Sequence, residues 1–88
     1  MIRKHVIVSG RVQGVFFRDG CEQAARRHRV TGWVANRDDG SVEAVFEGDD
    51  GAVREMVDWV RRGTSRAQVT GVEVTDERPE GLPDFSVR

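Results

Sequence analysis

The sequence has a single cysteine, no long apolar run and almost no excess of either charge. The lone Cys21 excludes an internal disulfide. Residues 1–9 contain no more than three consecutive strongly apolar residues, so we expect neither a secretory signal nor a membrane-spanning segment. Together these features favour a reducing compartment, and we expect a cytoplasmic protein.

The charge balance limits the kinds of partner. Fourteen Lys and Arg residues stand against fifteen Asp and Glu residues, which gives a net charge of −1. This balance argues against nucleic acid or a membrane surface as a partner bound mainly through charge, so any basic site must be local. No repeat, linker or low-complexity tract divides the 88 residues. We therefore expect one domain over residues 1–88, with one core, and a monomer.

The spacing of apolar residues predicts strands that alternate with helices. A period of two predicts strands over about residues 4–12, 31–36, 42–46 and 69–74, the second and third joined as a hairpin. Helical spacing predicts helices over residues 18–28 and from Asp49 or Asp50 to Gly63, and a short strand can follow at 85–88. The βαββαβ order predicts an α+β fold, the ferredoxin-like split βαβ sandwich, with an antiparallel sheet and two helices on one face.

This topology brings two distant loops together. Right-handed crossovers make the first two strands parallel, with one antiparallel strand between them. Their carboxyl ends then share one edge, which places the Gln13-Gly14 loop and Asn36 about 10 Å apart across two strand spacings. One small ligand can reach both loops.

The segment Gly10 to Arg18 is the strongest candidate for a binding site. A short strand runs into a glycine-bearing loop that ends on Arg18 and opens a helix. Backbone N–H groups in such a loop form a positive concavity for an anion, and Arg18 adds a planar two-donor fork. Gly14 either lets these N–H groups converge or only makes a tight turn. Asn36 either orients a water or is a structural turn residue.

The sequence gives little support to a cysteine nucleophile, a metal site or a serine nucleophile. Cys21 and Arg27 have the spacing of the tyrosine-phosphatase pattern, but the residues between them favour helix and not an anion loop, so we expect Cys21 in the core. His5 and His28 lie on different elements with no ligands at metal-binding spacing. We therefore expect no metal and no cofactor, and no serine has the surroundings of a nucleophile.

The chain resembles the acylphosphatases over essentially its whole length. The resemblance is carried by residues 9–18 (SGRVQGVFFR) and 31–44 (TGWVANRDDGSVEA), followed by 46–48 (FEG). It implies metal-free hydrolysis of a small-molecule acyl phosphate to a carboxylate and inorganic phosphate, which can act as product or inhibitor. Arg18 and Asn36 match the phosphate-binding arginine and water-orienting asparagine of that family. The backbone N–H groups of the loop would hold the phosphoryl oxygens; these belong to Gln13, Gly14, Val15, Phe16 and Phe17.

Two segments depart from the common pattern of this family. Asp19-Gly20 stands where an aromatic or bulky residue is often found, and Thr64-Ser65-Arg66 replaces a more proline-rich stretch. Asp19 can stabilise the positive helix N-terminus or weaken anion binding beside Arg18.

Two alternative functions remain open at the level of sequence. One is a non-catalytic phosphate-binding module, or an acylphosphatase-like domain that serves a larger carbamoyl-transfer machine. The other is a single-strand RNA binder, because RNA-recognition domains share the split βαβ topology and stack bases on sheet aromatics. Only Phe46 and Trp33 are available for that stacking.

Overall fold

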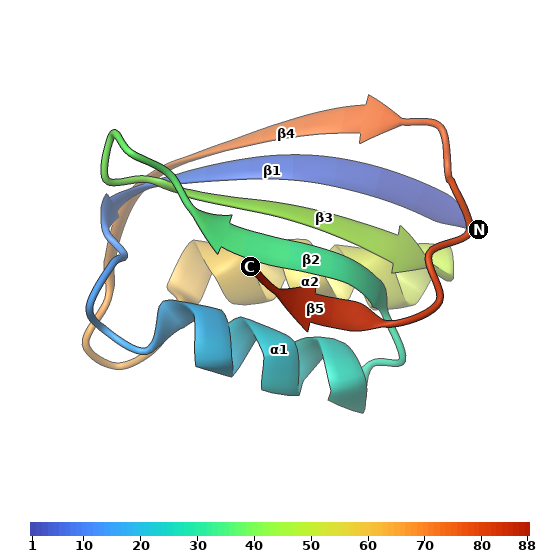
Figure 1. The fold of residues 1–88 in the computed structure, drawn as a ribbon, viewed down its shortest axis with the longest axis horizontal. Coiled ribbons are helices and arrows are strands. Elements are labelled where there is room, and N and C mark those ends of the chain that lie inside the picture. Colours follow the sequence, from blue (N-terminus) through green and yellow to red (C-terminus); the bar gives the residue numbers. More distant parts are fainter.

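The computed structural model describes all residues from 1 to 88 as a sheet with both helices on one face (Figure 1). The elements are β1 (Ile2–Arg11), α1 (Phe17–Arg27), β2 (Thr31–Asn36), β3 (Val42–Gly48), α2 (Asp50–Arg62), β4 (Gln68–Glu77) and β5 (Phe85–Val87). This order confirms the ferredoxin-like prediction. Neither helix has the length and apolar composition needed to cross a membrane.

Strands β1 to β4 form the predicted antiparallel sheet, and the short strand β5 makes the whole sheet mixed. Its strand order is β4-β1-β3-β2-β5. Strand β1 is antiparallel to β3 and β4, and β2 is antiparallel to β3, but β5 is parallel to β2. The chain leaves β4 at the end of the sheet where β2 begins and crosses to the β2 edge there (Figure 1). From that end, β5 can run along β2 only in the parallel direction.

A cluster of buried apolar residues joins the two layers. Helix α1 contributes Phe17, Cys21, Ala24 and Ala25 to it, so the prediction that Cys21 lies in the core is confirmed. Helix α2 contributes Val53, Met56 and Val60. The sheet supplies mainly small and branched residues, which pack closely against both helices.

Helix α2 begins and ends at the predicted residues, but its N-terminal end lacks the expected capping hydrogen bond from a side chain. Asp49 is the N-cap residue, but its side chain makes no capping hydrogen bond. The main-chain oxygen of Asp49 instead accepts a bond from the Val53 N–H at 2.9 Å. Gly63 ends the helix with a φ of 69° and a ψ of −159°, a combination that is essentially restricted to glycine.

Gly10 lies at a β-bulge where β1 and β4 approach closely. The register between β1 and β4 shifts at Ser9/Gly10, directly before the candidate loop. A Cβ on Gly10 would lie only 2.1 Å from the main-chain oxygen of Gln68. Glycine therefore lets β1 and β4 approach where the chain turns away from the sheet.

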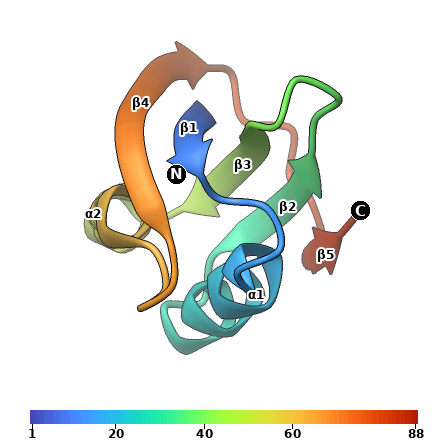
Figure 2. The same cartoon turned by 90° about the vertical axis from the view of Figure 1, so that its left-hand side faces the viewer.

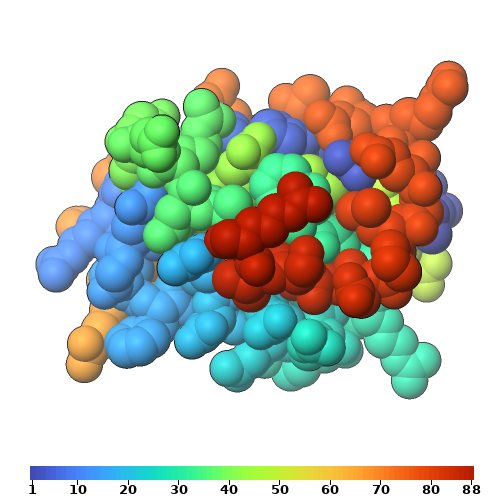
Figure 3. Space-filling model, viewed as in Figure 1, coloured from blue at the N-terminus to red at the C-terminus, as the bar shows by residue number.

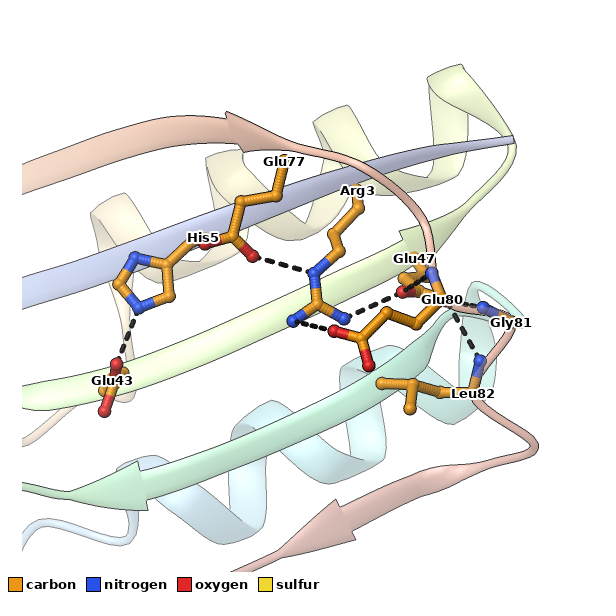
Figure 4. Close-up of polar contacts among 8 residues, drawn as sticks. All are labelled: Arg3, His5, Glu43, Glu47, Glu77, Glu80, Gly81 and Leu82. Carbon is orange, nitrogen blue, oxygen red and sulfur yellow. Dashed lines mark hydrogen bonds and ion pairs between the residues drawn. The ribbon is translucent and has the colours of Figure 1, made fainter.

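A buried ion pair fixes the segment that leads into β5. The Glu47 side chain is fully buried and accepts a hydrogen bond from the Arg3 guanidinium at 2.8 Å. It also accepts main-chain N–H bonds from Glu80, Gly81 and Leu82 at 2.8–3.0 Å (Figure 4). Burial alone would raise the pKa of Glu47, but these donors outweigh it and lower the pKa to about 2.

We expect Glu47→Gln to lower the free energy of unfolding by about 3 kcal/mol at neutral pH. An amide carries no charge, and its NH₂ group would face either the guanidinium or the loop N–H groups, which are all donors. Denaturant unfolding at pH 7 measures the loss. The matched control is Glu80→Gln, because that exposed carboxylate pairs with the same arginine and should cost less than about 1 kcal/mol.

The pH dependence of unfolding gives a second measure of Glu47. Its pKa is about 2 in the folded chain against an ordinary 4.5, so its stabilisation is complete above about pH 4.5. The stabilisation is lost as the pH falls from there towards 2. The difference in stability between the wild type and Glu47→Gln should therefore shrink over this window; a constant difference would contradict the assignment.

Candidate active site

A cavity of about 310 Å³ lies where the loop after β1 meets the first turn of α1. Figure 2 looks onto this end of the molecule, where the loop passes from β1 to α1 beside the end of β2. The lining residues come from strand ends, the loop and the helix; they are Val12, Gly14, Phe16, Phe17, Arg18, Asp19, Asn36 and Val87. The structure thus brings Arg18 and Asn36 to one cavity, as the topology predicted.

The loop backbone has the geometry of an anion nest. Gly14 and Phe16 have φ angles of 73° and 61°, so left-handed residues alternate with others along the loop. Such alternation turns successive N–H groups to one side. A Cβ on Gly14 would meet nothing within 4 Å, so this glycine is needed for conformation and not for packing.

The N–H groups of this loop have no hydrogen-bond partner within the protein. They are the main-chain N–H groups of residues 13–17. Phe16 adopts the left-handed conformation although it has a side chain, which costs on the order of 1 kcal/mol or more. Backbone strain of this kind is concentrated at functional sites, and here it accompanies unpaired donors.

Arg18 lies in the first turn of α1 and is held by the residue that follows the edge strand β5. Its Nη1 donates a hydrogen bond to the main-chain oxygen of Arg88 at 2.9 Å, directly after β5. A guanidinium has five N–H donors, so this bond leaves others for a ligand. In Figure 3 the red C-terminal segment lies between α1, in blue to cyan, and the green atoms of β2 and its hairpin.

Asn36 is the last residue of β2, and its side chain is exposed at the cavity. Its amide makes no hydrogen bond within the protein, so both its donors and its carbonyl oxygen can contact a water or a ligand. Since β5 pairs with β2, Val87 lies beside the same strand end. The site therefore combines an unpaired amide, a guanidinium and a backbone nest.

Gly20, which departs from the family pattern, is explained by packing between the helices. A Cβ at this position would lie 2.8 Å from the Trp59 ring of α2. That ring also packs edge-on against Phe17, with centroids 5.2 Å apart. Trp59 thus fills the space next to the start of α1, and a bulky residue at position 20 would displace it.

Sequence reasoning missed two contributors to the site. Val87 lines the cavity because β5 joins the edge of the sheet, and its partner strand is far away in the sequence. Thr64, in the segment after α2, donates a hydrogen bond from its hydroxyl group to the Val15 main-chain oxygen at 2.6 Å and so supports the loop. No local pattern indicates either contact.

Cys21 is not placed for nucleophilic chemistry. It is fully buried in α1, and burial raises the pKa of its thiol far above the ordinary value. We expect Cys21→Ala to keep at least half of the wild-type kcat, because the thiol reaches no ligand. Turnover of an acyl phosphate, the substrate class that the resemblance implies, by both proteins tests this. A loss of more than about tenfold in a folded variant would contradict it.

The structure gives little support to two remaining alternatives, a metal site and an RNA-binding surface. It contains no group of three or more His, Cys, Asp or Glu side chains placed to hold a metal ion. His5 instead pairs with Glu43 at 2.6 Å on the face away from the helices. Phe46 is fully buried and stacks on Phe85, and Arg88 covers the Trp33 ring at 4.5 Å, so neither ring is open to a base.

Comparison with known proteins agrees with this site. A family model described as acylphosphatase matches residues 4–87. The chain is 55% identical to the acylphosphatase of Haloarcula marismortui, over 98% of this chain and 94% of that protein. It is 57% identical to the acylphosphatase of Rubrobacter xylanophilus, over 98% of this chain and 79% of that protein. The crystal structure of acylphosphatase from Bacillus subtilis superposes with a TM-score of 0.96 at 42% identity, covering 100% of this chain and 99% of that one. The motif in the loop before α1, the asparagine that ends β2 and the whole-length match together place this chain in the acylphosphatase family.

Proposed function

We propose that the protein hydrolyses acyl phosphates to a carboxylate and inorganic phosphate, with Arg18 and Asn36 as its catalytic residues. The observation that carries this is one cavity, which Arg18 and Asn36 line together with Gly14, Phe16 and Phe17 of the loop with unpaired N–H groups. Family membership supports the reaction class.

The reaction needs charge stabilisation more than acid catalysis. A leaving carboxylate has a conjugate acid with a pKa near 4, so it departs without being protonated. The loose transition state of phosphoryl transfer spreads negative charge over the phosphoryl oxygens. In our proposal Arg18 and the backbone N–H groups of residues 13–17 hold these oxygens in the strained loop described above.

Asn36 is proposed to hold the attacking water. Its amide can accept a hydrogen bond from the water and orient the lone pair of the water towards phosphorus, in line with the leaving carboxylate. The new bond joins the water oxygen to phosphorus, and the bond that breaks joins phosphorus to the acyl oxygen. The bonding electrons leave with the carboxylate, and a phosphoryl oxygen takes the proton of the water. No metal or cofactor is part of this scheme.

Hydrolysis of benzoyl phosphate in the presence of EDTA tests the proposal. We expect turnover that the chelator does not reduce, and competitive inhibition by inorganic phosphate. The assay follows loss of the acyl phosphate against its spontaneous hydrolysis in the same buffer. Phosphate binding without turnover would contradict the proposal and favour the non-catalytic phosphate-binding module.

The proposal also covers the domain organisation, the partners, the oligomeric state and the location of the protein. One core cluster contains residues of both helices and of the sheet, which supports residues 1–88 as a single domain. A small-molecule acyl phosphate is then the main partner, and the small, charge-balanced chain supports a monomer without nucleic acid. The free thiol of Cys21 is compatible with the proposed cytoplasmic location.

A further inference from the structure

The side chain of Gln13 joins the two loops that form the site. Its Nε2 donates one hydrogen bond to the main-chain oxygen of Arg37 at 2.7 Å and another to that of Ser41 at 2.9 Å. Residues 37 and 41 lie on either side of the turn between β2 and β3. Gln13 itself follows β1, so one amide group connects segments that start from different strands.

These contacts require a side chain that donates two hydrogen bonds. Both neighbours are carbonyl oxygens, so only the NH₂ group of the side chain can face them. Both N–H donors are used, at distances that are normal for N–H···O bonds. A carboxylate at this position would set a negative charge against two carbonyl oxygens, and an apolar side chain would make neither bond.

The same two oxygens already hold the turn together. The Ser41 oxygen accepts the Arg37 N–H at 2.8 Å, and the Arg37 oxygen accepts the Gly40 N–H at 3.2 Å. Gln13 thus binds the base of the turn at the residue that directly follows Asn36. A shift of the turn relative to the loop would move the Asn36 amide relative to the backbone nest and Arg18.

We infer that Gln13 is a positioning residue, whose side chain sets the distance between the water site at Asn36 and the phosphoryl site in the loop. This role is distinct from that of its backbone N–H, which any residue at position 13 keeps. It rests on the proposed function, because it concerns the alignment of the water with phosphorus. The phosphoryl group should still bind when the alignment is lost.

The test replaces the amide by a side chain of similar length that cannot donate. We expect Gln13→Met to lower kcat for benzoyl phosphate by about tenfold or more, since small misplacements of reacting groups are costly. KM and the inhibition constant of inorganic phosphate should change less than about threefold, because Arg18 and the loop N–H groups remain. The matched control is Gln23→Met on the exposed face of α1, which should have the wild-type kcat.

A double-mutant cycle separates positioning from a general loss of structure. If Gln13 acts through Asn36, adding Gln13→Met to Asn36→Ala should slow that variant by less than about threefold. Two effects that multiply, or a Gln13→Met variant with the wild-type kcat, would overturn the inference. An inactive wild-type protein would instead contradict the proposed function, and circular dichroism confirms that each variant is folded.

Discussion

Replacement of Arg18 by alanine is expected to lower kcat/KM for benzoyl phosphate by about 10³-fold or more. The guanidinium supplies a full positive charge and several N–H donors to oxygens whose negative charge grows in the transition state. The backbone nest remains in the variant but carries only partial charges. Inhibition by inorganic phosphate should weaken as well, because the same donors contact the product.

The conservative variant separates charge from geometry. Lysine keeps the positive charge of Arg18 but lacks the planar fork, so Arg18→Lys should recover only part of the lost activity. Arg26→Ala is the matched control, since that residue lies on the same helix and pairs only with Glu22 at 3.1 Å. An Arg18→Ala variant with wild-type kcat/KM would contradict the site assignment.

Replacement of Asn36 by alanine is expected to lower kcat by about 10²-fold while KM changes little. The amide contacts the water and not the phosphoryl oxygens in our proposal, so the loss should appear in the chemical step. Steady-state kinetics with benzoyl phosphate and inhibition by inorganic phosphate together measure this separation.

Asn36→Asp is the contrasting variant, because the aspartate side chain has nearly the same size as that of asparagine but carries a negative charge. A carboxylate next to the cavity should repel the phosphoryl dianion, so KM and the phosphate inhibition constant should rise in addition to the fall in kcat. If Asn36→Ala weakened phosphate inhibition as strongly as Arg18→Ala, Asn36 would be a phosphate ligand and not a water-positioning residue.

The parts of the structure that were predicted from the sequence depend on local patterns. The alternation of Val6 and Val8, the helical spacing around Cys21 and the glycine of the loop each act within a few residues. The βαββαβ order then fixes which strand ends meet, because crossover handedness leaves few topologies. For this reason Arg18 and Asn36 could be assigned to one edge before the structure was known.

The parts that were not predicted depend on contacts between distant segments. Strand β5 has only three residues, so nothing local indicates that it runs parallel to β2. Glu47 follows the alternation expected for the face away from the helices, yet it is fully buried because residues 80–82 cross over it. The side chain of Gln13 finds its acceptors only after the β2–β3 turn has folded against the loop.

The central claim is that water attacks phosphorus while Arg18 and the loop hold the phosphoryl group. Hydrolysis of benzoyl phosphate by the wild-type protein in H₂¹⁸O tests it most directly, with mass spectrometry of both products. The account predicts that the solvent oxygen enters inorganic phosphate and that benzoate keeps only its original oxygens. Solvent ¹⁸O in benzoate would show attack at the acyl carbon and would contradict the account.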